Sequence, residues 1–139
     1  MRRTRFVLLL VVGLIVPGCG DDPFGVEDAL GVWDLRQFNG LAISGTAPTG
    51  VWIREDGGAD SSLVPVESIV LEFAAASACV WTFDDGIQGA VTDDDCRYGI
   101  TDDGAVSVTI SGTLLEGTGK GPIMTLRDEA TNELRFEKR

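Results

Sequence analysis

The acidic side chains are the groups in this sequence with the clearest capacity for chemistry. Within residues 29–139, aspartates stand next to one another at three places, Asp84-Asp85, Asp93-Asp94-Asp95 and Asp102-Asp103. Paired carboxylates can do acid–base work when burial raises the pKa of one of them, and clustered carboxylates attract calcium. Each group lies in or beside a predicted turn, where aspartate is favoured because it hydrogen-bonds its own backbone. The spacing of an EF-hand loop is absent, so we expect turns rather than catalytic acids or a metal site.

A nucleophilic enzyme also finds little support. Nucleophilic catalysis needs a base beside the nucleophile, and the sequence contains no histidine. Ser44 precedes Gly45, but the segment is not a Gly-x-Ser-x-Gly elbow, and no Ser-x-x-Lys is present. We therefore expect a protein that is not an enzyme, with no catalytic residue and no cofactor.

The beginning of the chain has the build of a secretory signal peptide. Arg2, Arg3 and Arg5 precede an apolar run from Phe6 to Val16, and small residues follow. The run is too short to cross a bilayer, which takes roughly 20 apolar residues. We expect residues 1–18 to be removed on export.

The exit from this segment, Val16-Pro17-Gly18-Cys19, resembles the lipobox of bacterial lipoproteins. The resemblance implies thioether lipidation of Cys19, cleavage before it, and acylation of the new amino group by a chain such as palmitate. Each buried CH₂ contributes about 0.8 kcal/mol, and two or more chains give stable anchoring. We expect a lipid-anchored domain outside the cytoplasm, on the cell membrane or the outer membrane. Gly20 lacks the acid that favours inner-membrane retention, which tilts the prediction toward the outer membrane.

The net charge narrows the class of partner. The whole chain carries 11 basic and 22 acidic residues, and loss of residues 1–18 removes three arginines and no acid, which leaves a formal charge of −14. Nucleic acid and anionic lipid surfaces both require basic patches. We therefore expect no nucleic-acid partner.

With Cys19 lipidated, Cys79 and Cys96 remain as the only other cysteines. Outside the reducing cytoplasm they can form a disulfide, which would stabilise the fold by about 3 kcal/mol on the chain-entropy model. No Cys-x-x-Cys motif suggests a redox role. We predict a structural Cys79–Cys96 disulfide.

The elements that carry these residues follow a period of two. Residues 19–28 form a polar tether, and residues 29–139 fit one domain. Trp33 and Leu35 alternate with polar residues, and the same pattern recurs at 69–73, 79–83, 96–100, 106–110, 123–127 and 133–138. Asn39-Gly40 is a hairpin turn, and residues 55–62 are a loop. The pattern predicts an all-β fold of about eight short antiparallel strands, as an up-and-down barrel or a β-sandwich. The barrel is favoured because it leaves no open edges.

Gly31-Val32-Trp33 resembles the Gly-x-Trp opening of lipocalin-like proteins, and the layout as far as Leu134-Arg135-Phe136 is similar to small bacterial lipoproteins with a calycin-type barrel. The resemblance implies that Trp33 closes the barrel base and that an arginine of the last strand packs over it. Arg135 is the positional match. The alternation favours Leu134 and Phe136 as the inward residues, which would point Arg135 outward.

Two kinds of binding function follow. The first is a carrier or sensor of a small apolar ligand, with Trp33, Trp81, Phe83 and Tyr98 as lining. The second is a protein-interaction module of the cell envelope, such as a protease inhibitor or an assembly accessory, which uses loops or Trp52. If Val51 and Ile53 face the core, Trp52 is exposed and can anchor a partner; with the opposite phase it fills the barrel. A side-chain-filled interior would favour the second function.

Overall fold

The computed structural model describes residues 22–43, 52–54 and 63–139, with side chains at 22–43 and 66–139. The expected signal peptide, Cys19, Ser44 and the loop 55–62 lie outside this part of the chain, as does the side chain of Trp52.

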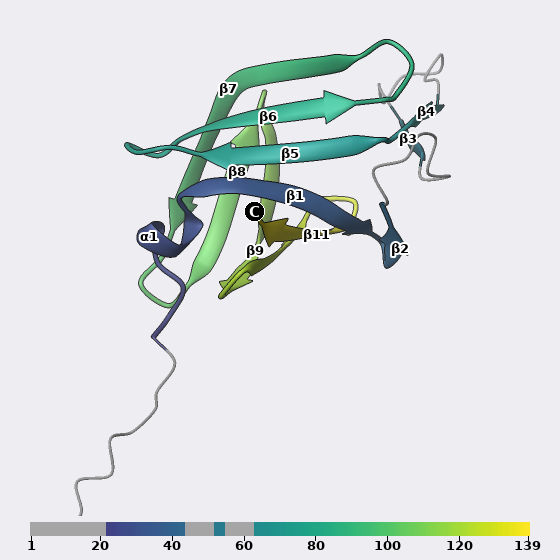
Figure 1. The fold of residues 1–139 in the computed structure, drawn as a ribbon. Helices are drawn as coiled ribbons and strands as arrows, with labels where there is room; N and C mark the ends of the chain where they lie inside the picture. The colour runs from purple at the N-terminus through teal and green to yellow at the C-terminus, as the bar shows by residue number, and fades with distance from the viewer. Residues whose placement is uncertain (1–21, 44–51, 55–62) are drawn as a thin grey trace, which may run out of the picture.

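The main sheet closes into a small antiparallel barrel (Figure 1). Eight of its nine strands follow one another around the barrel, and β11 pairs with β1 to complete it. This arrangement confirms the predicted all-β, up-and-down barrel and excludes the alternative of a sandwich. The barrel strands are β1 (Gly31–Phe38), β5 (Ser68–Phe73), β6 (Ala78–Asp84), β7 (Ala90–Ile100), β8 (Ala105–Ile110), β9 (Thr113–Lys120), β10 (Ile123–Arg127) and β11 (Glu133–Lys138).

The segment between β1 and β5 adds three short strands. β2 (Leu41–Ala42) folds back on β1 through the predicted Asn39-Gly40 turn. Both turn residues have positive φ, 48° and 78°, which is the conformation that a two-residue hairpin requires. β3 (Trp52–Arg54) and β4 (Leu63–Pro65) form a separate two-stranded sheet. Trp52 therefore begins a strand, opposite Pro65.

Alternating side chains build the core. On β8, Val106 and Val108 are buried and Ser107 is not; on β11, Leu134 and Phe136 are buried. Removing such side chains from water is the main stabilising term of the fold. The large side chains with less than 2% exposure are Trp33, Phe136, Ile69, Leu71, Met124, Leu126, Val66, Val106 and Val108.

A short helix, α1 (Val26–Ala29), lies at the end of the barrel where β1 begins. We call this end the base, and the opposite end, which carries β2 and the turn between β6 and β7, the rim (Figure 1). Residues 22–28 were expected to be a polar tether, yet Phe24 is only 5% exposed and Ala29 is fully buried. Burial of the apolar Phe24 ring outweighs the polarity of its neighbours. Residues 22–29 therefore close the base instead of forming a tether.

Candidate functional site

Trp33 is the centre of the base. It is fully buried, and its indole N–H donates to the carbonyl oxygen of Ala29 at 2.7 Å. The Phe24 ring meets it edge to face, with centroids 6.0 Å apart. A buried tryptophan needs such a partner for its N–H. Trp33 thus ties β1 to α1 and serves the closure of the barrel.

The cation that packs over Trp33 is Lys138, not Arg135. Lys138 Nζ lies 5.7 Å from the centroid of the Trp33 ring and donates to the carbonyl oxygen of Asp28 at 2.7 Å. Arg135 instead approaches Glu137 at 3.6 Å. The contact that the resemblance implied for Arg135 is therefore wrong, and the outward direction that the alternation favoured for Arg135 is confirmed. The alternation explains why: Leu134 and Phe136 take the inward phase of β11, which turns Arg135 away from the interior.

The other three predicted lining residues face the interior but do not form one patch. Trp81 is half-buried, and its ring meets the fully buried Phe136 edge to face at 6.3 Å between centroids. Phe83 is half-buried and packs against the core nearer the rim. Tyr98 is buried beside Phe73, and its hydroxyl donates to the carbonyl oxygen of Ala74 at 2.8 Å. Burial raises the pKa of Tyr98. Only Trp81 and Phe83 follow one another toward the rim.

Cys79 and Cys96 form the predicted disulfide between β6 and β7. They stand directly opposite each other in the two strands, and both are buried. The bond holds β6 to β7 next to a register shift between Cys79 and Trp81. Beyond this irregularity β7 bends, so that its two halves belong to differently oriented parts of the barrel wall (Figure 1).

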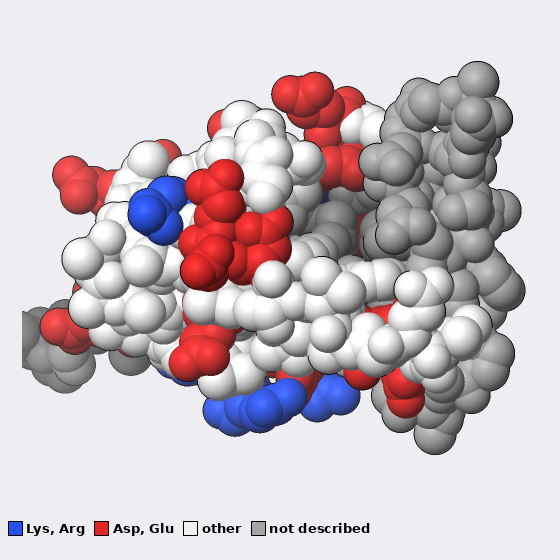
Figure 2. All heavy atoms as spheres, turned by 90° about the horizontal axis from the view of Figure 1, so that it is seen from above, with Lys and Arg blue, Asp and Glu red and all other residues white. Residues whose placement is uncertain are grey.

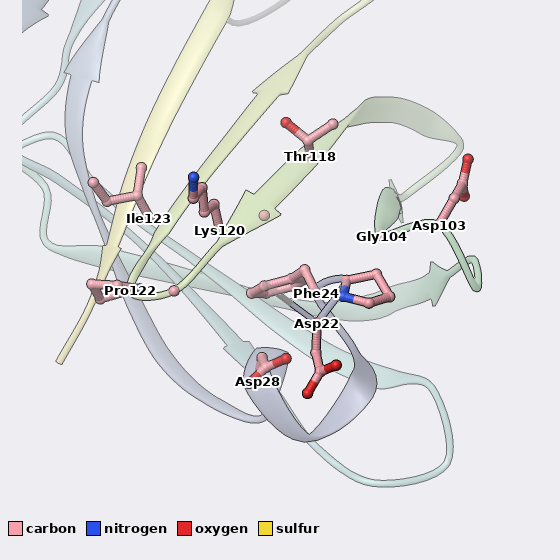
Figure 3. A pocket seen from close by; sticks show the side chains of 12 residues that line it. Asp22, Phe24, Asp28, Asp103, Gly104, Thr118, Lys120, Pro122 and Ile123 are labelled. Atoms are coloured by element: carbon pink, nitrogen blue, oxygen red, sulfur yellow. The ribbon is translucent and has the colours of Figure 1, made fainter. Parts of the chain in front are cut away.

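A cavity of about 870 Å³ lies at the base, between the N-terminal segment and the ends of β8, β9 and β10. The Phe24 ring is one of the side chains that line it (Figure 3). A Cβ atom at Gly119 would lie 2.5 Å from that ring, so only glycine leaves room for it. Asp28 accepts the Gly25 N–H at 2.9 Å, and Asp103 accepts the Thr101 hydroxyl. These hydrogen bonds of the two acids serve the local fold.

The paired aspartates of the β6–β7 turn also act locally. Asp85 is the buried polar residue of the described chain, with 6% exposure. Its carboxylate accepts the backbone N–H groups of Ile87 and Gln88 at 2.8 and 2.7 Å, which lowers its pKa. The Asp84 carboxylate accepts the Gly86 N–H at 2.8 Å. As predicted, these acids build the turn.

Asp102 and Asp103 lie in the turn between β7 and β8, also as predicted. The Thr101 hydroxyl lowers the pKa of Asp103. Asp93, Asp94 and Asp95 differ, because they lie within β7 rather than in a turn. The β6–β7 hairpin extends further than the sequence pattern predicted, since β7 already begins at Ala90.

The extension leaves part of β7 with one neighbour. β6 pairs with β7 from Ala90 onward, whereas β8 pairs with it only from Cys96 to Ile100. Among the described strands, residues 90–94 therefore have no partner on the side away from β6. Val91 is 65% exposed here, and Ile87 in the adjacent turn is 74% exposed. Acidic side chains gather in the middle of the face seen from above the hairpin, whereas the basic ones lie mainly along its lower edge (Figure 2).

The described residues contain no group of three or more Cys, Asp or Glu side chains placed to hold a metal ion. The same residues include no helix long and apolar enough to span a membrane.

Comparison with known proteins identifies no relative. The chain matches no protein family, no curated protein and no solved structure. The described residues form a small closed eight-stranded antiparallel barrel, an architecture consistent with a calycin-like fold.

Proposed function

We propose that this chain is a lipid-anchored, non-catalytic protein of the bacterial envelope, and that its barrel binds another protein. The observation that carries the proposal is that, among the described residues, side chains fill the interior around Trp33, Met124 and Phe136. Trp33, Phe136 and Met124 are fully buried, and Trp81 reaches Phe136 inside the barrel. Small barrels of eight strands are just wide enough to be filled by side chains. A barrel of this kind presents its outer surface, rather than its interior, to a partner.

The anchor would also orient the barrel. Residue 22 enters the base only three positions after Cys19, and three extended residues span at most about 11 Å. The base would then lie against the membrane, and the rim would point away from it. The most exposed apolar residues of the β6–β7 hairpin, Ile87 and Val91, would face the aqueous compartment, where a partner can reach them.

The anchor is tested with Cys19→Ser. The unaltered chain should take up radiolabelled palmitate and sediment with membranes, because two or more acyl chains give stable attachment. The variant should do neither. Labelling that persists in Cys19→Ser would overturn the proposed lipidation site.

The binding mode is tested by photo-crosslinking in the cells of origin. A photoreactive residue at Ile87 on the hairpin should give a discrete protein adduct, whereas one at the exposed Thr109 of the barrel wall should not. Equal adducts at both positions would mean random contact and contradict a partner site at the rim.

A small apolar ligand remains the second candidate. It is favoured by the half-buried Trp81 and Phe83, which pack with Phe38 against the core instead of being sealed within it. Native mass spectrometry of the processed chain decides between the two candidates. A reproducible small-molecule mass that is lost in Trp81→Ala would support the carrier. It would contradict the proposal that the barrel is filled and binds a protein instead.

A further inference from the structure

The open side of β7, residues 90–94, is the described surface best suited to add a strand; we call it the β7 edge. It is bounded at one end by the β6–β7 turn and at the other by the β8–β9 turn, where Ser111 N–H donates to the carbonyl oxygen of Asp95 at 2.8 Å. Ala90, Val91, Thr92 and Asp94 are all exposed. An edge of this kind presents backbone donors and acceptors that pair readily with another chain.

The side chains along the β7 edge have a fixed order. Val91 and Asp93 stand opposite Phe83 and Trp81 in β6, so they lie on the face of the sheet that turns toward the barrel interior. Thr92 stands opposite Thr82 on the other face, where the two hydroxyls are 3.3 Å apart. Asp94 follows at the register shift. The edge thus offers one apolar position, one polar position and two neighbouring acids, of which Asp93 already accepts the Asp95 N–H at 2.9 Å and the Ser111 hydroxyl.

The negative charge of the β7 edge favours some added strands over others. A second copy of the chain would place its own Asp93 and Asp94 close to these acids, and like charges on opposed strands are destabilising. A basic segment would meet opposite charges at the same positions. The net charge of the chain, −11 even before any processing, works in the same direction.

We propose that the β7 edge takes up an extended basic segment of a partner protein as an added antiparallel strand. The proposal rests on the proposed function and names its partner class. The partner strand, read from its N-terminus, would place basic residues opposite Asp94 and Asp93, a polar β-branched residue opposite Thr92 and an apolar residue opposite Val91. Backbone pairing supplies the attraction, and the alternating side chains supply the selectivity.

The test uses the processed chain purified from its own host and a labelled ten-residue peptide with Lys-Lys-Thr-Val at its centre. Fluorescence anisotropy should detect saturable binding that weakens as salt is raised. Replacing the two lysines by glutamate should abolish it. Replacing both the central threonine and the valine after it by proline should also abolish it, because the N–H groups of successive residues point to opposite sides of a strand, and one of the two prolines therefore removes a donor that faces β7.

The matched variants are Asp94→Lys on the β7 edge and Glu116→Lys on the wall strand β9, which make the same change of charge. Asp94→Lys should weaken the peptide roughly tenfold or more, because an attractive cross-strand pair becomes a repulsive one. Glu116→Lys should leave the affinity unchanged. Equal losses in both variants, or full binding of the proline peptide, would mean general charge attraction and overturn strand addition.

Failure of this inference can be separated from failure of the proposed function. If the Lys-Lys-Thr-Val peptide does not bind while Ile87 still gives a discrete crosslink, the basic-strand partner is wrong and the rim function stands. If the purified chain dimerises and a photoreactive residue at Thr92 crosslinks the two copies to each other, the occupant of the edge is a second copy rather than a basic segment.

Discussion

Lys138, the last residue of β11, lies over the ring of Trp33 in the register position directly across from it on β1. The same ammonium group donates to the carbonyl oxygen of Asp28. One side chain therefore joins the first strand, the last strand and the N-terminal segment at the base. This junction, rather than a contact of Arg135, packs over the buried tryptophan where β1 and β11 close the barrel.

Replacing Lys138 tests that junction. Lys138→Met keeps the aliphatic stem but removes the cation over the ring and the hydrogen bond to Asp28. We expect a loss of about 0.5–1.5 kcal/mol in the free energy of unfolding. Arg135→Met removes only a partly exposed ion pair and should cost less than about 0.5 kcal/mol. Urea unfolding followed by tryptophan fluorescence gives both values. A larger loss in Arg135→Met would restore the arginine as the closing cation.

The fit between Phe24 and Gly119 gives a second prediction. Gly119→Ala forces a methyl group against the Phe24 ring and should destabilise the protein by about 1–3 kcal/mol. In a Phe24→Ala background the same substitution should cost little, because the obstructing ring is gone. The coupling is measured as a double-mutant cycle from four denaturation curves.

Gly117→Ala is the control for this cycle. A Cβ atom there collides with the Thr125 backbone instead of a side chain, so Phe24→Ala should not relieve it. If Phe24→Ala rescues both glycine substitutions equally, Phe24 is not what fills the space at Gly119.

The disulfide gives a third prediction. Replacing both Cys79 and Cys96 by alanine should lower the free energy of unfolding by about 3 kcal/mol, because the cross-link restricts the unfolded chain. Reducing the unaltered protein should lower its stability by a similar amount. The measurement is guanidinium unfolding with and without a thiol reductant. A reductant effect that persists in the double variant would show that the stabilisation has another source.

Acid should weaken the β6–β7 turn. The two backbone hydrogen bonds to Asp85 lower its pKa in the folded protein. The stabilisation is therefore present above the pKa of the unfolded state, near 4, and is lost as the pH falls through the lower folded pKa. The stability difference between the protein and Asp85→Asn should be largest near pH 6 and shrink toward pH 2.5.

Unfolding curves at a series of pH values measure this difference. Glu129→Gln, an exposed acid in the β10–β11 turn, controls for the general change of charge. If Asp85→Asn and Glu129→Gln give the same dependence on pH, the hydrogen bonds at the turn are not its cause.

Local alternation made much of the fold predictable. Val106 and Val108 on β8, and Leu134 and Phe136 on β11, show the period of a half-buried strand, and the structure buries all four. The Cys79–Cys96 pairing was predictable because the expected lipidation of Cys19 would leave no other cysteine as a partner. Asn39-Gly40 was predictable because few residue pairs accept positive φ at both positions.

Non-local contacts account for what the sequence did not indicate. The neighbours of Phe24 in the sequence are acidic and turn residues, which do not indicate that Phe24 is buried. Its ring fits in the space left by Gly119, which is distant in the sequence. β7 extends back to Ala90 because β6 pairs with it there, although three consecutive aspartates are unfavourable in a strand. Lys138 reaches Trp33 only through the closure of β1 against β11. The free edge at 90–94 follows from the different lengths of neighbouring strands, which no single segment encodes.

The pairing of β1 with β11 also determines when the barrel can close during folding. Its partners stand as far apart as Asp34 and Arg139, whose side chains meet across 105 residues of sequence. Such distant closure is slow, because a long loop must be ordered before the contact repays it. If the chain crosses a membrane on export, as the proposed function requires, β1 emerges first and waits for the final strand. During that interval both closing edges stand open, and a chain interrupted before β11 would never seal. Envelope proteases should degrade such a chain. Only a chain that includes β11 would therefore accumulate.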